Sequence, residues 1–246
     1  MKYVVSVAVT APRAVEAFRA LAARYGVEVI EAPMVTIEPA PIDPYAVISA
    51  LRESDLALFA TGSAAYRIAQ VLKEAGLLGE ASRLLANLTV ATIEGEKGAI
   101  MIKNAFGTAP KVVASSAEEL QPLACRRAAV FHYGWRDPDL LSKVKCEAFE
   151  FQPYTARPPP RETVDRALGA DAVVFASALA VRFFAEVGGE DAVELLKGKI
   201  VVAAGPAVSR ALRELGVPHL TAPRGRIGPL AQYVVSLLLR RGAARA

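Results

Sequence analysis

The chain has 246 residues, of which 53% are hydrophobic and 22% charged, and it carries a formal net charge of +4. This length provides one large domain or two small ones with an apolar core. Because the basic residues are spread among acidic ones, the charge argues against sequence-independent DNA binding, although a small polyanionic ligand remains compatible with it.

The segments of the first half alternate between strand-like and helix-like patterns. No apolar run approaches the 18 residues of a transmembrane helix, and the valine-rich start is more typical of a strand than of a secretion signal. Pro12 is expected near the start of the first helix and Gly26 at its end. The expected segments are strand 4–9, helix 13–25, extended segment 27–37, proline-rich linker 39–44, helix 45–53, strand 56–60, helix 63–75 and strand 88–93.

The second half of the sequence repeats the first. Residues 55–68 align without gaps with residues 171–184, which pairs Asp55 with Asp171 and Thr61 with Ser177. Three further pairs of segments match in the same order: 4–10 with 129–133, 27–41 with 144–158, and 90–93 with 201–204. The repeat predicts two similar α/β lobes, each built of short βα units.

Two extended segments, 27–37 and 146–157, are expected to cross between the lobes. Ligands of parallel sheets bind at the carboxyl ends of the strands, and ligands of two-lobed proteins bind between the lobes. We therefore expect the site in a cleft between two facing sheets.

Four turns that follow strands and precede helices are candidate anion sites. They are Thr10, Thr61-Gly62-Ser63, Ser177-Ala178 and the segment from Gly205-Pro206 to Ser209, which precedes a helix expected at 210–215. Small residues allow a ligand to approach helix N-terminal amides, which favour carboxylates and phosphates. The alternative is that the hydroxyl residues are ordinary helix caps. No phosphate-binding loop or dinucleotide fingerprint is present in the sequence.

The remaining chemistry-bearing residues are few. The only cysteines are Cys125 and Cys146, which we expect to be buried and reduced, and His132 and His219 are expected to be solvated or capping. This content excludes a zinc cluster of familiar spacing. Tyr154 lies at the end of the second extended segment, where its phenol is expected to face the cleft as a weak general acid. The alternative is an aromatic residue that packs at a hinge.

Four short motifs occur along the chain. They are Thr-x-Pro at the end of the first strand (10–12), a repeated D-x-x-x-F pattern that is well kept at 171–181, an A-x-G-P…A-L-x-x-x-G stretch at 203–216, and Tyr154-Thr155 on the return segment. In these motifs the chain resembles the uroporphyrinogen-III synthase family. The resemblance spans the whole chain, and the order of these short motifs carries it.

The resemblance implies an α/β fold with two similar lobes of parallel sheet flanked by helices and joined by a two-stranded β-ladder. One lobe would comprise residues 1–35 and 155–246, and the other residues 36–154. The implied reaction cyclises hydroxymethylbilane to uroporphyrinogen III with loss of water and inversion of ring D. The implied protein is a cytoplasmic monomer without cofactor or metal that binds neither nucleic acid nor membrane.

The resemblance also assigns the site. Tyr154 would be the catalytic residue. The implied substrate-binding residues are Thr10, Arg13, Thr61, Gly62, Ser63, Ser177, Ala178, Leu179, Gly205, Pro206 and Ser209.

Five positions depart from the family pattern, namely Ala11, Ser63, Glu94, Ala207 and Val208. The departures at Ala11, Glu94, Ala207 and Val208 leave open the alternative that the protein is a relative that has lost its activity. A further alternative is a non-catalytic two-lobed protein that closes on a small anion as a sensor. Such a sensor would bind its ligand without converting it.

Overall fold

The computed structural model describes residues 5–223 and 227–243 and forms two compact α/β units. Unit 1 contains the described residues up to Thr36 and those from Arg157 onward, and unit 2 is Ile37–Ala156. The sequence predicts a second lobe of residues 36–154, which begins one residue earlier and ends two residues earlier than unit 2. Among the described helices, none is long and apolar enough to cross a membrane.

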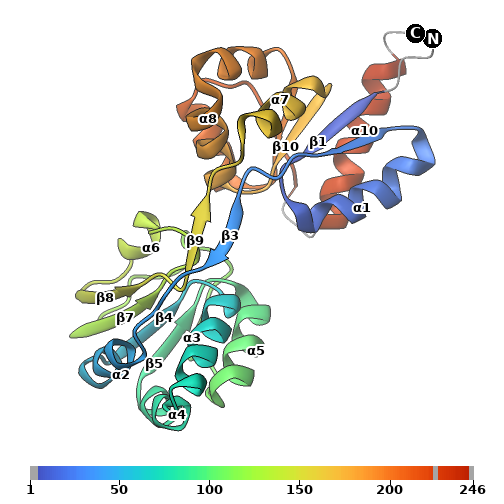
Figure 1. The fold of residues 1–246 in the computed structure, drawn as a ribbon. Coiled ribbons are helices and arrows are strands. Elements are labelled where there is room, and N and C mark those ends of the chain that lie inside the picture. Colours follow the sequence, from blue (N-terminus) through green and yellow to red (C-terminus); the bar gives the residue numbers. More distant parts are fainter. Residues whose placement is uncertain (1–4, 224–226, 244–246) are drawn as a thin grey trace. The chain divides into compact units, whose positions relative to one another are not determined.

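Unit 1 is built on a five-stranded sheet in the order β12-β11-β10-β1-β2, in which all neighbouring strands run parallel. Helices α1 and α10 cover one face and α7, α8 and α9 the other (Figure 1). The strands are β1 (Ser6–Val9), β2 (Glu28–Glu31), β10 (Ala172–Phe175), β11 (Ile200–Ala203) and β12 (Leu220–Thr221). The helices are α1 (Pro12–Ala22), the 3-10 turn η1 (Ala23–Tyr25), α7 (Arg161–Gly169), α8 (Ala178–Lys197), α9 (Pro206–Glu214) and α10 (Ile227–Ala243).

Unit 2 contains a second five-stranded parallel sheet, in the order β6-β5-β4-β7-β8. Helices α2 to α5 pack on one face, where the rings of Phe59 and Phe131 stack with centroids 4.5 Å apart. The strands are β4 (Leu56–Phe59), β5 (Thr89–Thr92), β6 (Val112–Val113), β7 (Arg127–Phe131) and β8 (Glu147–Phe151). The helices are α2 (Pro44–Glu53), α3 (Gly62–Glu74), α4 (Leu78–Asn87), α5 (Gly95–Phe106) and α6 (Pro138–Leu141).

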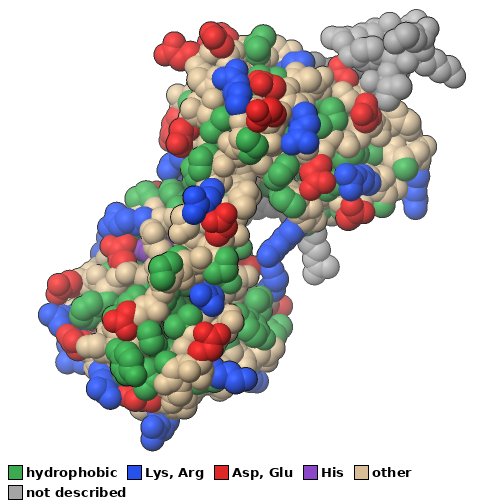
Figure 2. All heavy atoms as spheres, in the orientation of Figure 1, with side chains coloured by type: hydrophobic (Ala, Val, Ile, Leu, Met, Phe, Trp, Pro, Cys, Tyr) green, Lys and Arg blue, Asp and Glu red, His purple; other side chains and the backbone are tan. Residues whose placement is uncertain are grey.

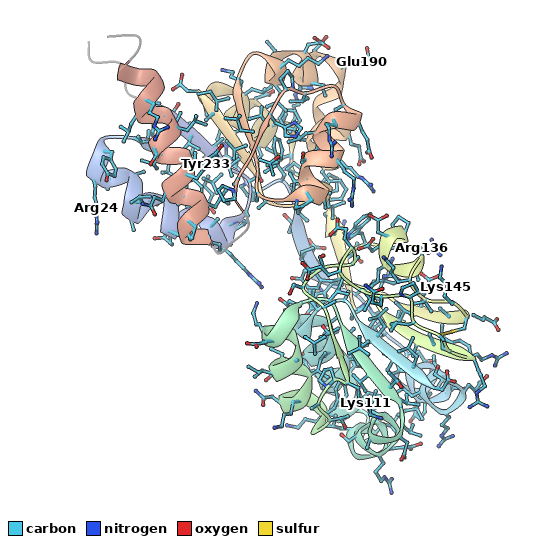
Figure 3. All side chains as sticks on the ribbon, turned by 180° about the vertical axis from the view of Figure 1, so that it is seen from behind. Arg24, Lys111, Arg136, Lys145, Glu190 and Tyr233 are labelled. Atoms are coloured by element: carbon cyan, nitrogen blue, oxygen red, sulfur yellow. A yellow bond between two sulfur atoms is a disulfide. The ribbon has the colours of Figure 1, made fainter. Side chains whose placement is uncertain are left out.

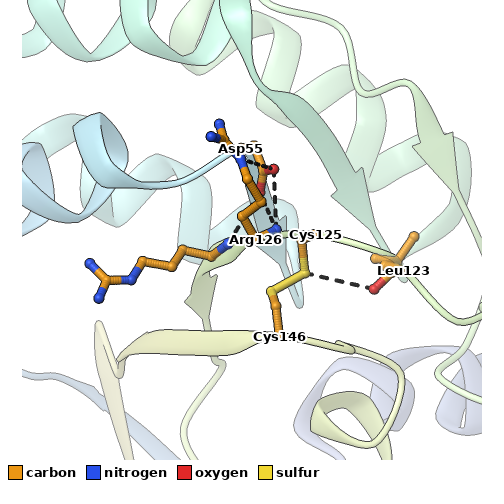
Figure 4. Close-up of polar contacts among 6 residues, drawn as sticks. Asp55, Leu123, Cys125, Arg126 and Cys146 are labelled. Atoms are coloured by element: carbon orange, nitrogen blue, oxygen red, sulfur yellow. Dashed lines mark hydrogen bonds and ion pairs between the residues drawn. A yellow bond between two sulfur atoms is a disulfide. The ribbon is translucent and has the colours of Figure 1, made fainter.

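The two sheets have corresponding strand orders, which confirms the predicted fold class of two similar parallel α/β lobes. Strands β10 and β4, which begin one residue after the aligned Asp171 and Asp55, are central in their sheets. The carboxylate of Asp171 accepts hydrogen bonds from the amide (2.8 Å) and hydroxyl (3.1 Å) of Ser6, at the start of β1. The carboxylate of Asp55 likewise accepts from the amides of Arg126 (3.0 Å) and Arg127 (3.3 Å), at the start of β7 (Figure 4). The repeated aspartate therefore ties the central strand to its neighbour in each unit.

The predicted β-ladder is the two-stranded antiparallel sheet of β3 (Thr36–Pro39) and β9 (Tyr154–Arg157). Each predicted extended segment is divided, because β2 and β8 belong to the large sheets and β3 and β9 to the small one. Pro33 and Pro153 lie at the two divisions. Proline has no amide hydrogen and cannot donate to a ladder, so the chain leaves one sheet there and enters another.

The sequence reading left residues 78–87 and 95–106 without helices, whereas the structure has α4 and α5 there. The first turn of α5 contains Gly95 and Gly98, and glycine is a poor helix former. Gly98 is required by packing, because a Cβ at this position would lie 2.8 Å from the Cβ of Glu94. These two glycines weakened the helical pattern in the sequence, and Gly98 is present because the packing of α5 leaves no room for a side chain.

The expectation of reduced cysteines is wrong in this structure. Cys125 and Cys146 form a disulfide, with Cα atoms 5.5 Å apart (Figure 4). They lie just before β7 and β8, which pair in parallel with Arg127 opposite Glu147. This register brings together two cysteines that are 21 residues apart in sequence, a proximity that spacing alone does not reveal.

Replacing Cys125 with Ser is expected to lower the free energy of unfolding by about 3 kcal/mol, because the disulfide limits the freedom of the unfolded chain. Denaturant unfolding without reductant measures this change. The unsubstituted protein treated with a thiol reductant is the control and should match the variant. An unfolding midpoint that neither the substitution nor the reductant moves would show that the cysteines are not linked in solution.

Candidate functional site

The carboxyl edge of the unit 1 sheet contains a pocket of about 270 Å³. Among the described residues it is lined by Ala11, Arg13, Ala14, Ala176, Ala204, Pro223, Ile227 and Leu230. The three residues at strand ends are alanines, which leave room for a ligand close to the backbone. Arg13 is exposed and has no ion-pair partner among the described residues. The pocket therefore combines an apolar wall with one available cation and suits an organic anion.

The structure places the other predicted residues of unit 1 differently. Thr10 is only 3% exposed, and its hydroxyl is buried without a partner in the described chain, so it does not line the pocket. Ser177 is the N-cap of α8, where its hydroxyl accepts the Ala180 amide at 3.1 Å. The next two residues, Ala178 and Leu179, are half-buried in the first turn of this helix. Their amides are among those that a helix leaves without an internal partner.

Ser209 in α9 is turned toward His219. The Ser209 hydroxyl lies 2.7 Å from His219 Nε2, and His219 Nδ1 lies 2.8 Å from the Val217 carbonyl oxygen. Since the carbonyl can only accept, Nδ1 carries the hydrogen and Nε2 accepts from the serine. This pair fastens α9 to the segment before β12, and His219 is not the solvated or capping residue expected from the sequence. Gly205 is the N-cap of α9, and Pro206 is its first residue.

The start of α3 in unit 2 corresponds to the start of α8 in unit 1, and it already binds a carboxylate. Thr61 caps α3 by accepting the Ala64 amide at 3.1 Å, and the Gly62 amide donates to Glu94 Oε2 at 2.7 Å. The other oxygen of Glu94 lies 3.1 Å from Lys97 Nζ. The α3 N-terminus therefore favours an anion, as its position predicts, but the anion comes from the chain itself. Glu94 is one of the positions that depart from the family pattern.

Gly62 is explained by packing between helices. A Cβ at this position would lie 2.4 Å from the Cβ of Met101 on α5. The close approach of α3 and α5 therefore requires glycine, whereas the sequence reading attributed the small residue to a ligand. The aligned hydroxyls of Thr61 and Ser177 are both helix caps, which was the alternative stated for them.

Tyr154 begins β9 and packs beside the start of α3. Its hydroxyl donates to the Ser63 carbonyl at 3.4 Å, and its ring meets that of Tyr133 edge to face, with centroids 5.2 Å apart. Burial and the neighbouring Tyr133 phenol raise the pKa of Tyr154 above its ordinary value, while the positive charge of Arg67 opposes this rise. The phenol is therefore protonated at neutral pH and is able to donate a proton or a hydrogen bond.

Sequence reasoning missed a polar cluster at the carboxyl ends of β7 and β8, in which one carboxylate links a buried side chain to a side chain at the surface. His132 is fully buried, and its Nε2 lies 2.9 Å from a Glu150 oxygen, so the expectation of a solvated or capping histidine is wrong. Arg136, at the surface of unit 2, holds the same carboxylate through Nε at 2.8 Å and Nη2 at 2.9 Å (Figure 3). Burial raises the pKa of Glu150, but the bonds from Arg136 and His132 outweigh it and lower the pKa. Only the pairing of β7 with β8 brings these residues together.

Replacing Glu150 with Gln is expected to destabilise the protein by about 2 kcal/mol at neutral pH, because the buried His132 loses its charged partner. The pKa of Glu150 is lower in the folded chain than in the unfolded chain. Its stabilisation is therefore full above the unfolded pKa and is lost as the pH falls through the folded pKa.

Thermal unfolding between neutral and acidic pH tests this prediction. The unsubstituted protein should lose more stability on acidification than the Glu150→Gln variant. Glu147→Gln, on the exposed side of the same strand, is the matched control and should change stability less. Parallel pH curves for the unsubstituted protein and the Glu150 variant would contradict the prediction.

Basic and acidic side chains are interspersed over the face of each unit that Figure 2 shows. This distribution provides no broad single-sign surface on that face. Binding of an anion would therefore depend on individual cationic side chains such as Arg13 and not on a broad charged surface.

Comparison with known proteins identifies the family. The profile of the family described as "Uroporphyrinogen-III synthase HemD" matches residues 6–232. The chain belongs to this family. The recognition made from the sequence is thereby confirmed, and with it the expected activity of a cyclising lyase that acts on a tetrapyrrole. Among curated proteins, none matches the chain.

Solved structures of uroporphyrinogen III synthase from the extremely thermophilic bacterium Thermus thermophilus share the fold over nearly the whole chain. A methionine-substituted mutant is 27% identical, with a TM-score of 0.75, and the match covers 96% of this chain and 99% of that one. The wild-type protein is 28% identical, with a TM-score of 0.58 and the same coverage. Neither match favours a non-catalytic sensor.

Proposed function

We propose that the protein converts hydroxymethylbilane to uroporphyrinogen III with Tyr154 as the acid that assists departure of the terminal hydroxyl. The observation that carries this role is the environment of the phenol. It is half-buried and donates only a long hydrogen bond of 3.4 Å to the Ser63 carbonyl. A proton held in this way is available to a substrate oxygen that forms a shorter bond.

In the proposed step, the C–O bond of the hydroxymethyl group breaks and its electron pair leaves with oxygen. The Tyr154 proton goes to that oxygen, so that water departs and a phenolate remains. The pyrrole nitrogen supplies electrons to the carbon, and loss of its N–H proton to the phenolate yields a neutral azafulvene. The azafulvene then reacts with ring D, and holding the chain folded for this closure supplies much of the catalysis.

The eight carboxylates of the bilane require cationic or amide partners. Arg13 and the first turn of α8, from Ser177 to Leu179, are best supported for this role, because the guanidinium lacks an ion-pair partner in the described chain and helix N-termini favour anions. The remaining predicted contacts have weaker support, because the Gly62 amide and the Ser209 hydroxyl are engaged within the protein and the Thr10 hydroxyl is buried. Thr61, Ser63, Gly205 and Pro206 stay predictions.

Isomer analysis tests the reaction itself. With freshly generated hydroxymethylbilane, we expect type III uroporphyrinogen in excess over a control without protein, in which spontaneous closure gives type I. Chromatography of the oxidised products separates the two isomers. Type I alone, from a folded protein that binds the bilane, would favour the sensor or the inactive relative.

Replacing Tyr154 with Phe is expected to lower kcat roughly a hundredfold, because a general acid in the transition state contributes at least that much. The fold should persist, since phenylalanine retains the ring contact with Tyr133. Tyr45→Phe is the matched control, because this tyrosine is 68% exposed on α2. A Tyr154→Phe variant with full kcat would reject the acid role and leave the family assignment intact.

The monomeric state and the cytoplasmic location implied by the resemblance stay predictions. Light scattering of the purified protein and fractionation of the source cells would test them. The absence of nucleic-acid partners likewise stays a prediction.

A further inference from the structure

Helix α3 of unit 2 contains a positively charged side chain to which the proposed reaction assigns no role. Arg67 lies in the second turn of α3 and is half-buried. Its Nη1 donates to Gln70 at 3.3 Å, whereas its Nε is buried without any hydrogen-bond partner in the described chain. No carboxylate of the described residues forms an ion pair with it. A buried donor without an acceptor is costly, and such groups in native proteins often mark a function.

The helix geometry directs this cation toward Tyr154. Arg67 follows Ser63 by four residues, so both lie on the same face of α3. Side chains on a helix point toward its N-terminus, which directs the guanidinium to the turn containing Ser63. The Ser63 carbonyl is the group that accepts the Tyr154 hydroxyl. The residue that accepts the phenol hydrogen bond is therefore one helical turn from Arg67.

The electrostatics of the phenol agree with this placement. Burial and Tyr133 raise the pKa of Tyr154, and Arg67 is the group that lowers it. A phenolate formed between a buried carbonyl and another phenol would be unstable without a nearby positive charge. Its present partner, the Ser63 carbonyl, cannot donate a hydrogen bond to it.

We propose that Arg67 is a positioning residue that stabilises the Tyr154 phenolate formed when the phenol gives its proton to the departing hydroxyl. The proposal rests on the acid role of Tyr154. The unpartnered Nε–H becomes a donor to the phenolate oxygen, and the interaction ends when the phenolate recovers a proton from the pyrrole N–H. Arg67 thus acts through Tyr154 and stabilises a charge that exists only during the reaction.

The test combines kinetics with direct titration of the phenol. Replacing Arg67 with Met should lower kcat by about tenfold or more while KM changes little, because the interaction arises after the substrate binds. In a Tyr154→Phe background, the same substitution should cause no additional loss. Carbon-13 labelling of the tyrosine ring carbon bonded to oxygen reports ionisation without turnover, and the Tyr154 signal should titrate at higher pH in Arg67→Met.

Two further variants make the result specific. Arg83→Met removes a positive charge from an exposed position on α4 of the same unit. This variant should leave both kcat and the Tyr154 titration unchanged. Arg67→Lys keeps the charge and should recover part of kcat, and it replaces Arg67→Met if that protein does not fold.

The outcomes separate the two proposals. If Tyr154→Phe is slow but Arg67→Met retains full kcat, or leaves the Tyr154 titration unmoved, the role of Arg67 is rejected and the acid role stands. An equal loss of kcat from Arg67→Met in both backgrounds also rejects it, because the residue would then not act through Tyr154. Full kcat in Tyr154→Phe rejects both proposals.

Discussion

The parallel direction of the strands in each five-stranded sheet places all their carboxyl ends at one edge. A helix that directly follows a strand of these sheets therefore begins at that edge, with its unpaired amides directed outward. In unit 1 this edge carries the pocket with Arg13, and in unit 2 it carries the turn at Thr61 together with Tyr154. The aspartates at the starts of β4 and β10 secure the arrangement by bonding the central strand of each sheet to its neighbour.

The repeated units are equivalent in topology but differ in chemistry. The start of α3 is occupied by the carboxylate of Glu94, whereas in the described chain no carboxylate is bonded to the start of α8. Unit 2 instead has the Tyr154 phenol bonded to the Ser63 carbonyl of α3, and one helical turn further along it has Arg67, whose Nε lacks a partner in the described chain. The proposed roles follow this difference, with carboxylate binding assigned to unit 1 and proton transfer to unit 2.

One connected set of polar groups in unit 2 links the buried His132 to the surface, because His132 Nε2 and the Arg136 guanidinium both contact the Glu150 carboxylate. Three buried polar atoms in the part of the chain that the structure describes lack a hydrogen-bond partner, namely the Thr10 hydroxyl, His132 Nδ1 and Arg67 Nε. Of the three side chains, Arg67 is the one whose charge acts on Tyr154, which is the ground for the role proposed for it.

The sequence by itself determined the fold class and the family. Strand and helix periodicity, the gapless alignment of residues 55–68 with 171–184, and the order of short motifs are local patterns that need no knowledge of contacts. Tertiary structure decided the disulfide, the His132–Glu150–Arg136 cluster, the occupation of the α3 N-terminus by Glu94, and the proximity of Arg67 to Tyr154. Each of these joins different elements of the chain. Strand register and helix packing set such distances, and the spacing of residues in the sequence does not encode them directly.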